Sequence, residues 1–164
     1  MKKYVLKIFC LLTFIFISQF SFANNNLKNK KGDVNAMKNL FLCSYFAGVK
    51  DIFKDFMNND TKGKKVLFIP TANIDEETKF LIDETKEVFK SLGMEVEDLE
   101  ISKLDEKTIK NKIEKTNYLY VGGGNTFYLL QELKRKNLID FIKNRVNSGM
   151  IYIGESAGAI ITSK

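Results

Sequence analysis

A serine flanked by glycines near the end of the sequence has the spacing of a catalytic motif. Residues 154–158 read Gly-Glu-Ser-Ala-Gly, and they separate the apolar run 150–153 from the apolar residues 159–161. A strand that ends at a small residue, presents one hydroxyl and turns at once into a helix has the geometry of a nucleophile elbow. We therefore interpret Ser156 as a candidate nucleophile.

The two glycines of this motif have a steric role. Gly154 and Gly158 lie two residues before and two residues after Ser156, so they leave room for a sharp turn that a Cβ atom would obstruct. The turn would place the N–H of Ala157 at the start of a helix, where unpaired N–H groups and the helix dipole favour a developing oxyanion. A tight strand-to-helix connection without catalysis needs the same small residues, so the motif alone leaves both interpretations open.

A second glycine-rich segment follows the apolar run 118–121. Residues 122–126 read Gly-Gly-Gly-Asn-Thr, and such a segment lets the backbone approach a bound group while its N–H donors point at that group. It lacks the lysine of a P-loop and the glycine spacing of a dinucleotide-binding loop, which argues against nucleotide binding. One interpretation is a simple glycine turn with Asn125 as helix N-cap; the functional one adds an oxyanion-hole donor from this loop to that of Ala157.

Strands and helices are expected to alternate from residue 37 to residue 164. The apolar and amphipathic patterns predict buried strands at 40–43, 65–69, 94–101, 118–121 and 150–153, and helices at 49–57, 75–92, 105–115, 125–136 and 138–147. This alternation predicts an α/β fold with a doubly wound, mainly parallel sheet and helices on both faces. Ligands bind such sheets at the carboxyl ends of the strands, where both glycine-rich turns fall. A right-handed crossover can place the two turns side by side.

The first 36 residues are expected to lie outside this domain. Residues 1–23 combine early lysines, an apolar stretch and small residues before Asn24, which predicts a signal peptide cleaved at that point. Residues 24–36 are polar and without periodicity, which indicates a flexible linker. We therefore expect a secreted or periplasmic protein with no stable membrane anchor after cleavage. Translation from Met37 would instead give a cytoplasmic protein.

The charge and the cysteines exclude some classes of partner. Residues 1–36 carry six lysines and one aspartate, whereas residues 37–164 carry 20 basic and 19 acidic residues. The nearly neutral domain gives no electrostatic reason to expect nucleic acid as a partner. The sequence has no histidine, and Cys10 and Cys43 lack the spacing of metal ligands, so we expect no metal and no other cofactor. Cys43 is expected to be a buried, inert thiol in a core strand.

Together these motifs resemble the peptidase E family of serine peptidases. The resemblance rests on residues 121–127, residues 154–158 and residues 68–72, and it extends from about Met37 to the end of the sequence. That family includes the aspartyl dipeptidases, and its class I glutamine amidotransferase-like fold is a flavodoxin-like, three-layer arrangement. The resemblance implies that short peptides with an N-terminal aspartate are cleaved through an acyl-enzyme on Ser156. It also implies an oxyanion hole formed by backbone N–H groups of Ala157, Gly123 and Gly124.

The base that would activate the serine is missing from the sequence. A serine hydroxyl attacks poorly until a base accepts its proton, and the 164 residues contain no histidine. Lys164 would lie roughly 12 Å from Ser156 along a helix, and the side chain of Glu155 should diverge from Ser156 across a sharp turn. We expect neither residue to replace the histidine.

In the family that the motifs resemble, the histidine, its acidic partner and the substrate-binding residues lie after the elbow. The resemblance therefore implies a domain that is incomplete at its C-terminus and a chain that is inactive alone. We also expect the strands that flank the fifth strand to be absent, which would leave a sheet edge and apolar surface uncovered.

Other functional classes fit the same motifs. A non-catalytic amidotransferase-like domain would use the loops to bind a small ligand or a partner, whereas the enzyme would bind a small peptide substrate. A glutamine-hydrolysing domain normally carries a cysteine where Ser156 stands, and an ordinary α/β-hydrolase differs in its oxyanion motif and strand order. An oligomer is compatible with either of the first two classes.

Overall fold

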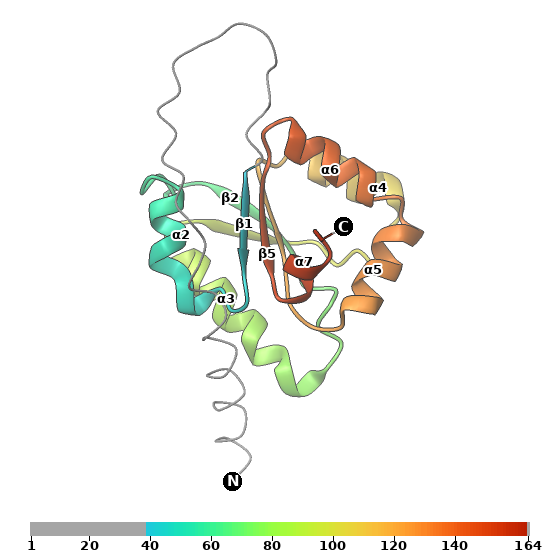
Figure 1. Cartoon of the computed structure of the whole chain (residues 1–164), viewed down its shortest axis with the longest axis horizontal. Helices are drawn as coiled ribbons and strands as arrows, with labels where there is room; N and C mark the ends of the chain where they lie inside the picture. The colour runs from blue at the N-terminus through green and yellow to red at the C-terminus, as the bar shows by residue number, and fades with distance from the viewer. Residues whose placement is uncertain (1–38, 164) are drawn as a thin grey trace, which may run out of the picture. The chain divides into compact units, whose positions relative to one another are not determined.

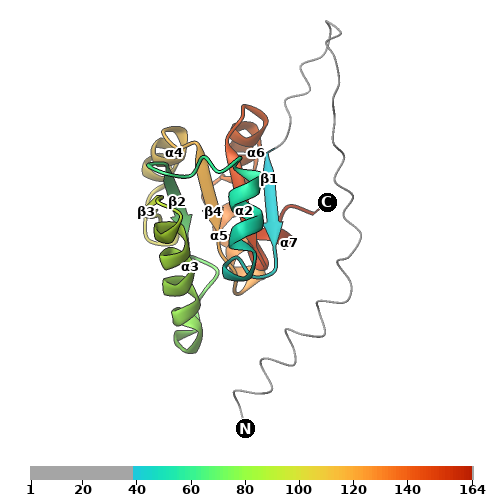
Figure 2. The ribbon, with the colours of Figure 1, turned by 90° about the vertical axis from the view of Figure 1, so that its left-hand side faces the viewer.

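Five parallel strands form one sheet in residues 39–163, the part of the chain that the computed structural model describes. The strands are β1 (Leu40–Cys43), β2 (Lys65–Ile69), β3 (Glu95–Asp98), β4 (Tyr118–Val121) and β5 (Ile151–Glu155). Their order is β1-β5-β4-β2-β3, and every neighbouring pair is parallel. Figure 2 shows β1 and β3 at opposite edges of the sheet. The predicted α/β class is therefore confirmed.

Helices cover both faces of the sheet, as the alternation predicted. They are the 3-10 helices η2 (Ala47–Val49) and η3 (Glu76–Thr78) and the α-helices α2 (Lys50–Phe56), α3 (Lys79–Ser91), α4 (Glu106–Glu114), α5 (Thr126–Arg135), α6 (Ile139–Asn147) and α7 (Ala157–Ile160). Figure 1 shows α2 and α3 on one side of the strands and α4, α5 and α6 on the other. The helix expected at 75–92 begins as the 3-10 turn η3 and becomes α-helical only at Lys79.

Local sequence sets the ends of several helices. The Asn125 side chain accepts a hydrogen bond from the Tyr128 backbone N–H at 3.0 Å, so Asn125 is the predicted N-cap of α5. Asp105 caps α4 in the same way. Helix α3 ends at Ser91, and Gly93, two residues further on, has a φ of 78° that lets the Met94 N–H donate to the Phe89 carbonyl at 3.0 Å.

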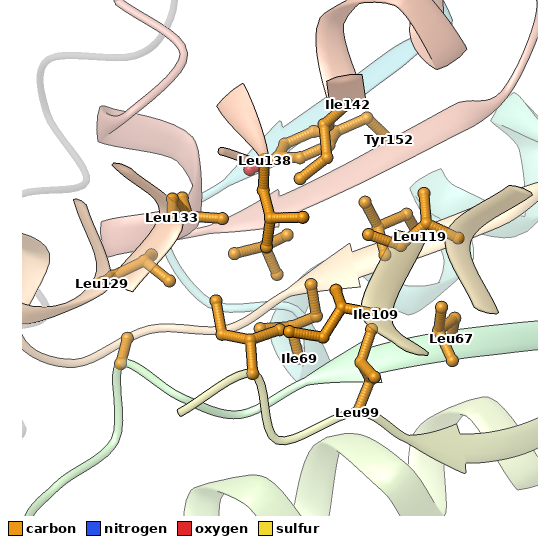
Figure 3. Close-up of a cluster of buried hydrophobic side chains, with 14 of the residues drawn as sticks. Leu67, Ile69, Leu99, Ile109, Leu119, Leu129, Leu133, Leu138, Ile142 and Tyr152 are labelled. Carbon is orange, nitrogen blue, oxygen red and sulfur yellow. The ribbon is translucent and has the colours of Figure 1, made fainter. Parts of the chain in front are cut away.

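The aliphatic face of the sheet packs against α4, α5 and α6. Strand residues such as Leu67, Ile69 and Leu119 meet helix residues such as Leu129 and Leu133, and all of them are at most 2% exposed. Figure 3 shows these side chains converging between the strands and helices. Burial of each such side chain contributes about 1.5–3 kcal/mol to stability relative to exposure.

The aromatic face of the sheet packs against α2 and α3. Each of its rings lies within 6.4 Å, centre to centre, of at least two others, and together they form a connected set made of Phe41, Phe46, Phe53, Phe68, Phe89 and Tyr120. Edge-to-face pairs predominate, with stacked pairs between Phe46 and Phe89 and between Phe68 and Tyr120. This geometry stabilises ring pairs beyond their burial.

The expectation that the fifth strand lacks flanking strands is wrong. Strand β5 lies between β4 and β1, because the chain crosses over to pair Cys43 with Glu155 and Val121 with Gly154. The exposed apolar edge lies instead along β1, where Leu40 is 37% and Leu42 is 45% exposed. Residues 40–43 therefore form an edge strand that is buried on one side only.

Several predictions fall on residues outside 39–163. The signal peptide at 1–23, the linker at 24–36, the alternative start at Met37 and the side chain of Lys164 are among them. Within the described residues, no helix has the length and apolar character needed to cross a bilayer.

Candidate active site around Ser156

Ser156 occupies a strained turn between β5 and α7. Its φ of 48° and ψ of −107° are unusual for a residue with a side chain, which costs on the order of 1–3 kcal/mol. Strand β5 continues through Gly154 and Glu155, two residues beyond its predicted end, and α7 begins at Ala157. The Ser156 side chain is exposed. Although Ser156 is the N-cap residue of α7, its hydroxyl accepts no capping hydrogen bond.

The glycines on either side of Ser156 are required by backbone packing. A Cβ atom on Gly154 would lie 2.7 Å from the carbonyl oxygen of Gly158, and one on Gly158 would lie 2.1 Å from that of Val121. Neither backbone oxygen can move away cheaply, so the predicted steric role of these glycines is confirmed. The hydroxyl of Tyr152 also donates to the Gly158 carbonyl at 2.7 Å and ties α7 to β5.

The glycine-rich loop after β4 lies beside Ser156. A Cβ atom on Gly123 would lie 3.2 Å from the Cβ and 3.7 Å from the Oγ of Ser156. The predicted juxtaposition of the two turns is therefore confirmed, because adjacent parallel strands β4 and β5 end at the same edge of the sheet. A side chain at position 123 would crowd Ser156, so glycine keeps the space beside its hydroxyl open.

Gly124 faces a different neighbour from Gly123. Its φ is 133°, and a Cβ atom there would lie 2.1 Å from the carbonyl oxygen of Ala72, in the segment that follows β2. The N–H of Asn125 donates to the same oxygen at 2.7 Å. Gly124 thus fixes the loop to the segment after β2, whereas Gly123 brings the loop to Ser156.

The side chain of Glu155 points into the interior, toward Tyr120 on the α2 and α3 side of the sheet, whereas Ser156 is exposed. Glu155 is 6% exposed, and its carboxylate accepts a hydrogen bond from the hydroxyl of Tyr120, with the Thr85 hydroxyl and the Phe46 N–H as further polar groups that favour its charged form. Burial raises the pKa of the Glu155 carboxyl, with a further contribution from the negative charge of Glu84, while the three donors oppose that shift. The carboxylate is therefore held away from Ser156, as expected.

Cys43 is the only cysteine among the described residues. Its side chain is half-buried, and its Sγ lies 3.7 Å from the Gly154 carbonyl oxygen. Burial, and secondarily the charge of Glu155, raises the pKa of this thiol to about 12. The thiol is thus protonated at neutral pH and a poor nucleophile. In residues 39–163 no three histidine, cysteine or acidic side chains gather as metal ligands.

The sequence did not predict the contacts that Glu155 and the Ser156 N–H make with distant parts of the chain. Tyr120 and Thr85 lie 35 and 70 positions from Glu155, so no local pattern links them to it. One signal was present: Glu155 follows an apolar strand directly, and a carboxylate that is buried at such a position needs donors. The carbonyl of Cys43, which accepts from the Ser156 N–H at 2.9 Å, depends on strand order and left no such signal.

Comparison with known proteins identifies relatives of this fold and site. The chain is 48% identical over 127 residues to the uncharacterized peptidase Lmo0363 of Listeria monocytogenes, covering 77% of this chain and 62% of that protein. It is 38% identical over 100 residues to peptidase E of Actinobacillus pleuropneumoniae serotype 5b, covering 61% and 41% respectively. The chain thus spans less than two thirds of the length of each of these relatives.

A solved structure agrees with the fold. A crystal structure of a provisionally named peptidase E protein from Listeria monocytogenes EGD-e superposes with a TM-score of 0.74 at 47% identity, covering 77% of this chain and 62% of that one. A family model, peptidase family S51, matches residues 40–164, which include both glycine-rich turns. The chain belongs to peptidase family S51.

Proposed function

We propose that this domain is a serine-type peptidase, a hydrolase of short peptides, with Ser156 as its nucleophile. The observation that carries the proposal is the state of the serine: it is exposed and strained, its hydroxyl is not used as a cap, and it lies against Gly123. A serine at a helix N-cap ordinarily accepts a hydrogen bond from the first turn. A hydroxyl left free at a strained turn is consistent with a catalytic role.

The proposed reaction proceeds through an acyl-enzyme. The Ser156 Oγ forms a bond to the carbonyl carbon of the peptide, its proton passes to a base, and the carbonyl oxygen becomes an oxyanion. Backbone N–H groups of Ala157 and of the Gly123–Gly124 segment would stabilise that oxyanion. Collapse of the intermediate breaks the C–N bond and releases the protonated amine. Water then hydrolyses the ester.

The substrate proposed is a short peptide with an N-terminal aspartate. Support comes from membership of family S51 and from relatives named peptidase E. The sequence contains no histidine, so this chain alone is expected to turn over peptide negligibly. We also propose, from the N-terminal sequence, that the protein is exported.

Chemical rescue tests the nucleophile without requiring a built-in base. The full chain is treated with a fluorophosphonate probe while free imidazole, a substitute base, is increased, and the rate of labelling is compared with that of Ser156→Ala. We expect the rate for the unsubstituted chain to rise with imidazole, with modification at Ser156 by mass spectrometry. Equal, imidazole-independent labelling of both proteins would exclude Ser156 as nucleophile and favour a domain that only binds a ligand or partner.

A further inference from the structure

The residue directly before Ser156 is tied to three separate parts of the fold. Glu155 ends β5, and its carboxylate receives a hydrogen bond from Tyr120 of β4, while the hydroxyl of Thr85 in α3 and the N–H of Phe46, just after β1, are further donors that favour its charged form. An ionised carboxylate accepts hydrogen bonds only, and its two oxygens have room for all three donors. The set therefore satisfies this buried group from several directions.

The donors are themselves held firmly. Tyr120 is 2% exposed and Thr85 is 1% exposed. The ring of Tyr120 stacks on Phe68 at 4.4 Å and meets the edges of Phe46 and Phe89. Burial and the charge of Glu155 raise the pKa of Tyr120 well above its usual value, so its hydroxyl stays a donor.

On the side of β1, the backbone of the turn depends on an edge strand. The Ser156 N–H donates to the Cys43 carbonyl at 2.9 Å, but Cys43 belongs to β1, an edge strand of four residues with Leu40 and Leu42 exposed. A residue with strained dihedrals keeps them only where its surroundings over-determine them. An edge strand that frays would allow Ser156 to relax, unless its neighbour were anchored elsewhere.

We propose that Glu155 is a positioning residue for Ser156: its buried carboxylate, hydrogen-bonded to Tyr120, holds the end of β5 so that the Ser156 hydroxyl stays beside Gly123. This inference rests on the proposed function for its catalytic meaning. The anchoring itself is a property of the fold and can be measured separately. A buried carboxylate is costly to stability, so its location directly behind the strained serine is consistent with a functional reason for keeping it.

The closest substitution for testing this is Glu155→Gln, which preserves shape but removes the charge. A carboxamide oxygen accepts at most two hydrogen bonds, and its NH₂ group faces donors instead of acceptors. The matched control is Glu132→Gln in α5, because Glu132 is also buried, at 4% exposed, but is paired with Arg135 on the other side of the sheet. Tyr120→Phe serves as a second variant that removes a single donor.

Hydrogen exchange measures the anchoring independently of any reaction. We expect the Ser156 amide, followed by mass spectrometry of peptides spanning 154–160 in the full chain, to exchange at least about tenfold faster in Glu155→Gln. Tyr120→Phe should give a smaller increase, and Glu132→Gln should match the unsubstituted chain. Unchanged exchange in both Glu155→Gln and Tyr120→Phe would overturn the inference, as would an equal increase in Glu132→Gln.

Imidazole-assisted labelling then links the anchoring to the serine. We expect the rate with fluorophosphonate to fall about tenfold or more in Glu155→Gln, as is usual for small displacements of a reacting group, while Glu132→Gln stays within about twofold of the unsubstituted chain. Faster exchange without slower labelling would overturn the positioning role. Failure of the unsubstituted chain to label above Ser156→Ala would instead overturn the proposed function, and the exchange result would still decide whether Glu155 anchors the turn.

Discussion

The two faces of the sheet differ in how they are packed and in what they bury. The aliphatic face joins leucine and isoleucine side chains of the strands to those of α4, α5 and α6. The aromatic face joins six rings under α2 and α3, and it also buries the Glu155 carboxylate. Aromatic pairs prefer specific stacked and edge-to-face arrangements, which aliphatic contacts do not. The aromatic face is thus suited to holding a polar group in a fixed place.

Ser156 lies at the end of β5, and its neighbours on the two sides of the turn pack in different faces of the sheet. The residue before it, Glu155, is anchored in the aromatic face, while the helix after it packs against the aliphatic face through Ala157 and Gly158. The strained turn is therefore fixed from two sides by different chemistry. Substitutions on each face should separate the two contributions.

The largest effect is expected on the aliphatic side, from Gly158→Ala. The new Cβ would lie 2.1 Å from the Val121 carbonyl oxygen, so either α7 or β4 must move. We expect a loss of more than about 3 kcal/mol in unfolding free energy, at the upper end of overpacking effects, measured by urea denaturation.

Gly149→Ala is the control for that substitution. Gly149 has a φ of 105°, but a Cβ there would meet nothing within 4 Å. Its cost should be only the conformational penalty, on the order of 1–3 kcal/mol. If Gly158→Ala proved no more costly than Gly149→Ala, the close packing of α7 on β4 would be contradicted.

Two tyrosines allow one hydrogen bond on each face of the sheet to be compared. Tyr120 donates to the carboxylate of Glu155 on the aromatic face, and Tyr152 donates to the neutral carbonyl of Gly158 on the aliphatic face. Hydrogen bonds to charged groups contribute about 1.5–3 kcal/mol, against about 0.5–1.5 kcal/mol for neutral ones. We expect Tyr120→Phe to destabilise more than Tyr152→Phe in parallel urea titrations. Equal losses would mean that the carboxylate does not strengthen its bond to Tyr120.

The sequence predicted local features of the fold and the site well. Strands 65–69 and 118–121 were predicted with the bounds that the structure gives them, because each is a short apolar run between polar or turn-forming residues. The steric need for Gly154 and Gly158 also followed from their spacing around Ser156. These features depend on residues that are close in sequence.

Features that depend on strand order were not predictable in the same way. The sequence indicated neither that β1 would pair with β5 nor that it would form an exposed edge, because pairing is set by crossovers. The end of β5 was placed at Ile153, since Glu155 looks like a turn residue until its donors on β4 and α3 are known. Buried polar networks between distant elements therefore need the structure.

The stability of the aromatic face should depend on pH, because this face buries the carboxyl of Glu155. Burial, and to a smaller extent the negative charge of Glu84, raises the pKa of Glu155, while Tyr120, the Phe46 N–H and Thr85 partly oppose that shift. A raised pKa in the folded state gives stability that is complete below the usual glutamate pKa and is lost as pH rises through the raised value. Relative to Glu155→Gln, the unfolding free energy of the unsubstituted chain should thus fall above about pH 4.5, by up to about 1.4 kcal/mol per pH unit.

Urea titrations at a series of pH values measure this difference directly. Glu84→Gln is a useful companion, because removing the charge of Glu84 should lower the pKa of Glu155, so that the fall ends at a lower pH and is smaller. A difference between the unsubstituted chain and Glu155→Gln that stays constant from about pH 4 to about pH 8 would contradict a raised pKa.

The smallest effect expected concerns the rings that surround the carboxylate. Phe46 and Phe89 stack with centroids 4.4 Å apart, and both meet Tyr120 edge-on. If ring geometry is what makes the aromatic face rigid, Phe46→Leu and Phe89→Leu should be non-additive in a double-mutant cycle, with a coupling of about 1 kcal/mol. The control cycle pairs Phe46→Leu with Leu129→Ala across the sheet and should be additive within about 0.5 kcal/mol. Equal coupling in both cycles would mean that the two faces respond as one core, and the anchoring of Glu155 could then not be assigned to the aromatic side alone.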